Sequence, residues 1–120
     1  MALEFFLDCE RDPPVAKLTG GLTLGPQLTR FSKAVLELLH SRCLSGLILD
    51  VGGIREIDSA GLGELVILYT ASSEGGSHLC LVGPNQRVLR LLEMTRLEGL
   101  LPHFADEPSA LDWLRGRVIE

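Results

Sequence analysis

Short runs of apolar residues alternate along the chain with longer stretches of helical periodicity. Three of the short runs are flanked by Gly, Pro, Ser or charged residues, which is typical of buried strands; they cover residues 15–18, 47–51 and 79–82. Residues 2–7 form a weaker strand candidate, which we place at an edge of the sheet. Residues 100–104 are a candidate for a further, short strand.

Four other stretches are predicted to be helical, because their apolar residues recur at steps that share one helix face. The first follows Pro26, which suits a first helical position because its missing N–H costs nothing there. The second covers residues 59–73 and ends before Gly75-Gly76. The third begins near Asn85, a good N-cap, and the fourth follows Pro108. The inward residues are expected to be Leu28, Phe31, Val35, Leu38 and Leu39 in the first helix, Leu62, Leu65, Val66 and Tyr69 in the second, Val88, Leu91, Leu92 and either Met94 or Thr95 in the third, and Leu111 and Leu114 in the fourth, with Trp113 at its side.

This alternation of strands and helices predicts the fold class. Parallel neighbouring strands need crossover connections of about a dozen residues, and the helical stretches supply them. A chain of 120 residues has the usual size of one domain. We therefore expect one α/β domain over residues 1–120, with a mixed, mostly parallel sheet of four to five strands and about four helices.

Composition narrows the class of function. Apolar residues make up 46% of the chain and charged residues 22%, so the chain can bury a core. The net charge of −5 offers no basic surface for nucleic acid. Three widely spaced cysteines without a CxxC pair indicate reduced thiols rather than disulfides or a zinc site. With no signal-peptide pattern and no apolar run of about 18 residues, we expect a cytoplasmic protein that does not insert into a membrane.

The stretch from residue 47 to residue 65 is the most informative one. It contains a buried strand, a loop predicted to run through Ile57, and a helix that opens at Asp58 or Ser59. Ligand sites in α/β sheets lie at the carboxyl ends of strands, and Ser59 is expected at or next to the N-cap. Free backbone N–H groups and the helix dipole favour a phosphate at that position.

Two glycines follow in the first turns of this helix, Gly61 and Gly63. Each costs about 1 kcal/mol relative to Ala in a helix interior. Without Cβ atoms the backbone is open to close approach, which suits a docking surface for another chain and also tight packing on the sheet. A capping serine beside packing glycines is therefore an alternative interpretation of the same segment.

No pattern indicates catalysis. Ser59 does not lie in a GxSxG elbow, and nothing in the sequence pairs it with a histidine. Metal ligands at chelating spacing are absent from the sequence, so we expect no catalytic residue, no metal and no cofactor. Neither glycine pair belongs to a nucleotide-binding motif, and both are predicted to lie in turns: Gly20-Gly21 and Gly52-Gly53.

These residues resemble the STAS domains, a family named for sulfate transporters and anti-sigma factor antagonists. The centre of the resemblance is Asp-Ser-x-Gly-Leu-Gly at residues 58–63, directly after the strand and loop of residues 47–57. Residues 88–92 and 97–100 also look like the family's pattern. The resemblance covers nearly the whole chain and implies a single STAS-like domain.

In bacterial anti-sigma factor antagonists, the serine that matches Ser59 is phosphorylated by a partner that is both a serine kinase and an anti-sigma factor, and a phosphatase reverses the reaction. The resemblance implies that the unphosphorylated form binds the anti-sigma factor and that the phosphorylated form lets go. A phosphoryl group adds about −1.5 to −2 charges, which agrees with such a switch. The residues that the resemblance places on the partner-binding surface are Thr23, Asp58, Ser59, Ala60, Gly61, Leu62 and Gly63.

One position departs from the family's pattern. Many members carry an Asp in the loop after the second strand, a loop that helps to form the partner surface, whereas Thr23 occupies that place here. The partner, and whether the chain forms a homodimer, are left open. STAS domains also serve in lipid-transport complexes and stress-sensing assemblies, so the alternative is a STAS subunit that regulates a lipid or anion transporter or a stress-sensing assembly.

Overall fold

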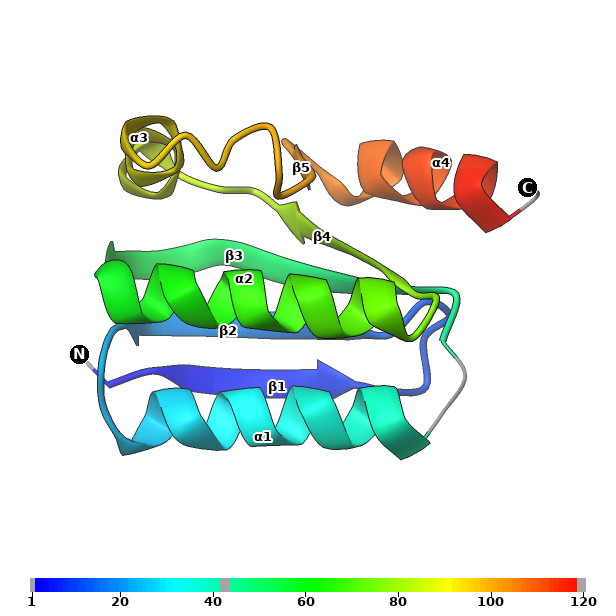
Figure 1. Ribbon diagram of the computed structural model, residues 1–120, viewed down its shortest axis with the longest axis horizontal. Coiled ribbons are helices and arrows are strands. Elements are labelled where there is room, and N and C mark those ends of the chain that lie inside the picture. The colour runs from blue at the N-terminus through cyan, green and yellow to red at the C-terminus, as the bar shows by residue number, and fades with distance from the viewer. Residues whose placement is uncertain (1, 42–43, 119–120) are drawn as a thin grey trace.

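The computed structural model of the chain describes residues 2–41 and 44–118 and shows strands alternating with helices (Figure 1). The elements in chain order are β1 (Glu4–Asp8), β2 (Val15–Leu22), α1 (Pro26–Ser41), β3 (Gly46–Ile57), α2 (Ser59–Glu74), β4 (His78–Val82), α3 (Gln86–Met94), β5 (His103–Phe104) and α4 (Glu107–Val118).

The five strands form one sheet in the order β1-β2-β3-β4-β5. β1 pairs with β2 in the antiparallel direction, and all other neighbours are parallel. The predicted α/β fold with a mixed, mostly parallel sheet is thus confirmed, as is the place of the first strand at an edge. The short strand expected within residues 100–104 is present as β5.

Helices cover both faces of the sheet, because successive residues of a strand point to opposite faces. In β3, Leu49 packs in a large core with side chains of α1, α2 and α3, whereas its neighbour Ile48 packs in a smaller core with α4. In Figure 1, α1 and α2 lie side by side in front of the strands. The packing of α1 and α2 next to each other brings the start of α2 close to the loop that leads into α1.

Two strands are longer than predicted. β3 continues through Gly52-Gly53 to Ile57, where a loop was predicted, and β2 continues through Gly20-Gly21 to Leu22. The prediction that both glycine pairs lie in turns is therefore wrong. At Gly53 the missing Cβ allows β2 and β3 to approach closely at a register irregularity, since a Cβ there would lie only 2.7 Å from Thr19 Cγ2.

The end of α3 also differs from the prediction. Val88 and Leu92 are buried as expected, but Met94 is 74% exposed and Thr95 is exposed as well. Thr95 caps the C-terminus of the helix, and its hydroxyl donates to the Leu91 carbonyl oxygen at 2.7 Å. Neither residue is part of the core, because α3 ends before another turn could carry a side chain back to the sheet.

Candidate functional site

Ser59 is the first residue of α2, directly beyond the carboxyl end of β3. Asp58 is the N-cap and has the extended backbone that this position requires (φ −118°, ψ −177°). The Ser59 side chain is exposed, and within residues 2–41 and 44–118 no group hydrogen-bonds to its hydroxyl. An external enzyme or partner can therefore reach this hydroxyl without breaking an internal contact.

Asp58 connects the start of α2 to the loop between β2 and α1. Its Oδ1 accepts from the Gly61 backbone N–H at 2.8 Å, and its Oδ2 accepts from the Leu24 backbone N–H at 3.0 Å. The bond from Gly61 first, and then that from Leu24, lower the pKa of the carboxyl group. A negative charge consequently lies next to Ser59 at neutral pH.

The loop held by Asp58 contains Thr23 and Leu24. Thr23 is half-buried, whereas the Leu24 side chain is 80% exposed. Leu24 was not predicted as a site residue, because one leucine between a strand and the turn at Gly25-Pro26 has no distinguishing pattern in the sequence. The hydrogen bond from the Leu24 N–H to Asp58 places Leu24 at the same end of the sheet as Ser59.

The two glycines of α2 have different surroundings. A Cβ at Gly61 would lie 1.9 Å from the Leu22 carbonyl oxygen and 2.7 Å from its carbonyl carbon, whereas a Cβ at Gly63 would meet no atom within 4 Å. Gly61 thus lets α2 pack closely on β2. Gly63 leaves a bare stretch of helix backbone at the surface.

The predicted partner-binding residues accordingly fall into two groups. Gly61 is buried, and Leu62 is only 4% exposed in the large core. The others are at least partly accessible, and Asp58 joins those of α2 to the loop that carries Thr23. The accessible residues are Thr23, Asp58, Ser59, Ala60 and Gly63.

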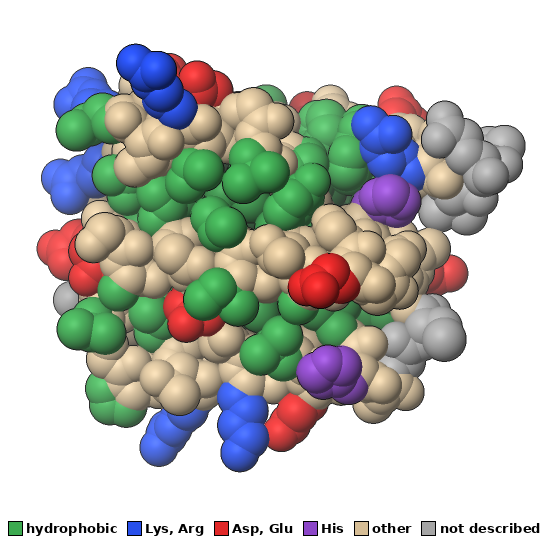
Figure 2. Space-filling view, viewed as in Figure 1, with side chains coloured by type: hydrophobic (Ala, Val, Ile, Leu, Met, Phe, Trp, Pro, Cys, Tyr) green, Lys and Arg blue, Asp and Glu red, His purple; other side chains and the backbone are tan. Residues whose placement is uncertain are grey.

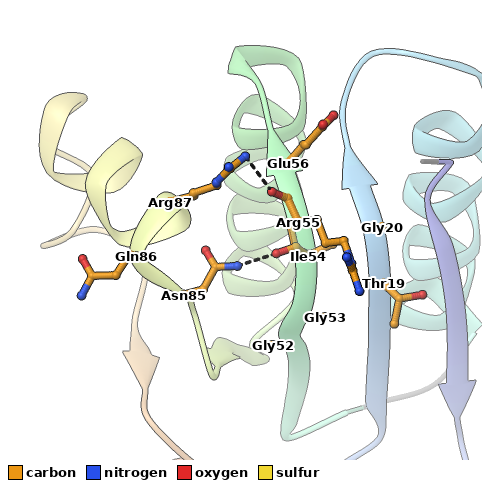
Figure 3. Close-up of a pocket in the computed structure, with 10 residues that line it drawn as sticks. All are labelled: Thr19, Gly20, Gly52, Gly53, Ile54, Arg55, Glu56, Asn85, Gln86 and Arg87. Atoms are coloured by element: carbon orange, nitrogen blue, oxygen red, sulfur yellow. Dashed lines mark hydrogen bonds between the residues drawn. The ribbon is translucent and has the colours of Figure 1, made fainter.

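A cavity of about 850 Å³ lies between β2, β3 and the start of α3 (Figure 3). The Asn85 amide donates to the Ile54 carbonyl oxygen while its Oδ1 accepts from the Val88 N–H, and the Arg87 guanidinium donates to the Arg55 carbonyl oxygen at 3.2 Å. These side chains fasten α3 to β3. Among the described residues that line the cavity, Glu56 carries a carboxylate and none is a histidine or a cysteine.

Residues 2–41 and 44–118 contain neither a candidate metal cluster nor a membrane-spanning helix. No group of three or more His, Cys, Asp or Glu side chains is placed so that it could hold a metal ion. Of the helices in the same ranges, none has the length and apolar character needed to cross a bilayer.

Comparison with known proteins places the chain in a family. The family model described as "Mlab, STAS domain" matches residues 5–102. The chain belongs to the STAS domain family. The fold and the position of the Asp-Ser-x-Gly-Leu-Gly segment after β3 agree with the resemblance found in the sequence.

Several similar proteins are named anti-sigma factor antagonists. This STAS domain is 30% identical over 87 residues to the "Putative anti-sigma factor antagonist TM1081 homolog" of Thermotoga neapolitana, over 72% of this chain and 77% of that protein. The crystal structure of the correspondingly named Thermotoga maritima protein matches with a TM-score of 0.74 at 26% identity, over 84% of this chain and 87% of the other. The anti-sigma factor antagonist SpoIIAA in its unphosphorylated form shares the fold, with a TM-score of 0.76 at 17% identity over 94% of this chain and 97% of the other. The chain is thus a STAS protein similar to anti-sigma factor antagonists.

Proposed function

We propose that this STAS domain binds a partner through the surface around Ser59 and that phosphorylation of Ser59 releases the partner. The Ser59 surface, as we define it, consists of Thr23, Leu24, Asp58, Ser59, Ala60 and Gly63. The observation that carries the proposal is the exposed Ser59 hydroxyl at the start of α2, free of internal hydrogen bonds in the described part of the chain.

The effect of a phosphoryl group on Ser59 would fall on the partner rather than on the fold. At the N-terminus of α2, backbone N–H groups and the helix dipole favour a phosphate, so the helix tolerates the modification. The added charge of about −1.5 to −2 would stand beside the ionised Asp58. A partner would have to desolvate both charges when it docks, and this cost weakens the complex.

Gly61 and Leu62 are proposed to support this surface from beneath. Their burial leaves almost no surface for a partner to contact. Gly61 sets the distance between α2 and β2, and Leu62 anchors the first turns of α2 in the core. A change at either position would alter partner binding through the placement of Ser59.

The partner proposed for the Ser59 surface is an anti-sigma factor that is also a serine kinase, with a phosphatase that restores the hydroxyl. This assignment is supported by the names of the similar proteins, which are antagonists of anti-sigma factors. The chain itself is proposed to be a cytoplasmic regulator without catalytic activity. Incubation of the pure protein with ATP should therefore give neither hydrolysis nor phosphorylation of Ser59.

The proposal is tested with the partner recovered by pull-down from the native cell and identified by mass spectrometry. Calorimetric titration should give equal affinity for wild type and Ser59→Ala, while Ser59→Ala is no longer phosphorylated. Ser59→Asp should weaken binding by about 2 kcal/mol or more, because a charge is desolvated at the interface. Ser109→Asp is the matched control, since Ser109 is an exposed serine in the first turn of α4.

Circular dichroism of each variant verifies the fold. Equal affinity of wild type, Ser59→Ala and Ser59→Asp would show that Ser59 serves only the start of the helix. Recovery of transporter subunits in place of an anti-sigma factor would favour the alternative, a STAS subunit that regulates a transporter.

A further inference from the structure

A second cavity, of about 640 Å³, lies away from the Ser59 surface. It is open to solvent and is bordered by the C-terminal half of α2, the start of β4, residues 98–104 and α4. Tyr69 is the lining residue nearest in sequence to Ser59, and ten residues of helix separate the two by about 15 Å. A molecule in this cavity would leave the Ser59 hydroxyl uncovered.

One wall of the cavity is aromatic and apolar. The Trp113 ring lies edge-on to His78 with centroids 6.0 Å apart, and its centroid is 5.5 Å from that of Phe104. Leu100, on the segment that borders the same cavity, is 42% exposed. These side chains are only partly covered by the protein and can still bury area against an aromatic ligand.

Arg117 supplies a positive charge at the same place. Its guanidinium carbon lies 4.6 Å from the centroid of the Trp113 ring. Glu98 also lines the cavity, but within residues 2–41 and 44–118 no carboxylate lies close enough to Arg117 to form an ion pair. Arg117 is also exposed, so its N–H donors are available to an anionic group.

We infer that this cavity binds a small, flat aromatic molecule that carries one anionic group. The volume lies in the range of small-molecule sites, about 300–1,000 Å³, and such sites combine apolar walls with a few polar groups. The aromatic body packs against Trp113, Phe104 and Leu100, and the anion is held by Arg117. Figure 2 shows this face of the molecule, with basic and histidine side chains beside an apolar patch.

The test uses two matched probes: anilinonaphthalene sulfonate, an aromatic anion, and N-phenylnaphthylamine, the same rings without the sulfonate. Trp113 is the single tryptophan of the chain, so the indole N–H signal in a proton–nitrogen correlation spectrum reports on this cavity alone. Titration with the sulfonate should shift this signal saturably, with one site per chain. The neutral probe should bind roughly threefold or more weakly, as expected for loss of an exposed ion pair.

Variants separate the charge from the apolar wall. Arg117→Gln should remove the preference for the sulfonate, whereas Arg115→Gln, on the same helix but paired with Asp112, should keep it. Leu100→Asp should weaken binding of both probes, and thermal unfolding verifies the fold of each variant. An unmoved Trp113 signal at saturating sulfonate, equal affinity for the two probes in the wild type, or the same result for Arg117→Gln and Arg115→Gln would overturn the inference. The test involves no protein partner, so its outcome is independent of the function proposed for Ser59.

Discussion

Gly61 and Gly63, two positions apart at the start of α2, show how much the surroundings of a residue decide its role. The missing side chain at position 61 leaves room for the main chain of Leu22, whereas the missing side chain at position 63 leaves the helix surface open. Glycine therefore allows close packing at position 61 and leaves the helix backbone accessible at position 63.

This difference predicts opposite effects of the same substitution. Gly61→Ala should lower the free energy of unfolding by about 1–3 kcal/mol, because its Cβ collides with backbone that cannot move aside. Gly63→Ala should leave it unchanged or raise it by up to about 1 kcal/mol, since Ala favours the helix and meets no neighbour. Urea unfolding followed by circular dichroism measures both. A Gly61→Ala protein as stable as the wild type would contradict the close contact of α2 with β2.

Leu24 is a single residue whose contribution to partner binding can be measured. Leu24→Ser should weaken partner binding by about 1 kcal/mol or more, because an exposed leucine that a partner covers buries apolar area. Stability should change little, since the side chain is 80% exposed. The control is Phe6→Ser, which removes another exposed apolar side chain, 66% exposed on β1. If calorimetric titration gives the same loss of affinity for both variants, Leu24 makes no specific contribution to partner binding.

At the scale of elements, Asp58 joins the start of α2 to the loop before α1. One carboxylate serves two backbone N–H groups, those of Gly61 and Leu24, with one oxygen each. An asparagine replaces one of these two oxygens with an NH2 group, so one of the two backbone N–H groups would then face a donor instead of an acceptor.

The lowered pKa of Asp58 gives this contact a pH dependence. Because the folded state binds the proton less readily than the unfolded chain, the stabilisation is present at neutral pH and is lost as the pH falls through the lowered pKa. Asp58→Asn should be less stable by about 1 kcal/mol at pH 7, and the difference should shrink below about pH 4. Urea unfolding across this pH range is the measurement.

Asp106→Asn is the matched control for this prediction. The Asp106 carboxylate accepts from the backbone N–H of Ser109, and the hydroxyl of the same residue also interacts with it. Both contacts come from one residue, and an asparagine oxygen can keep the backbone bond. Its loss of stability should therefore be smaller than that of Asp58→Asn. Equal losses would mean that the second bond, from Leu24, adds nothing to stability.

At the scale of the whole molecule, the sheet separates two cores. Cys80 on β4 lies in the smaller one, where Ile48 and Leu114 of α4 also pack, and none of its surface is exposed. Burial raises the pKa of the Cys80 thiol to about 12, because the charged thiolate loses its hydration. This thiol can react only when α4 and the sheet separate.

Alkylation of Cys80 should therefore report on opening of the fold. Iodoacetamide at pH 8 should leave Cys80 unmodified in the folded protein and modify it in urea, in step with the loss of helical circular dichroism. Mass spectrometry of the peptide that contains Cys80 gives the modified fraction. Modification of the native protein at the rate seen in urea would show that the smaller core is open in solution.

Much of the fold was predictable from the sequence, because periodicity is a local property. The helix that starts at Pro26 and the helix capped by Asn85 lie where their capping residues and apolar spacing placed them. The continuation of β3 through Gly52-Gly53 was not predictable. Glycine pairs usually mark turns, and here only the partner strand, with Thr19 against Gly53, shows why they lie within the sheet.

The sequence by itself determined the α/β class, the order of the elements and the position of Ser59 at the start of α2. These properties depend on spacing along the chain, which sets helix faces, strand lengths and caps. The tertiary structure alone decided that Gly61 is buried and Gly63 accessible, that Leu24 joins the Ser59 surface, and that Arg117 and Leu100 share a cavity. These properties depend on contacts between residues far apart in the chain, and such contacts leave no local pattern in the sequence.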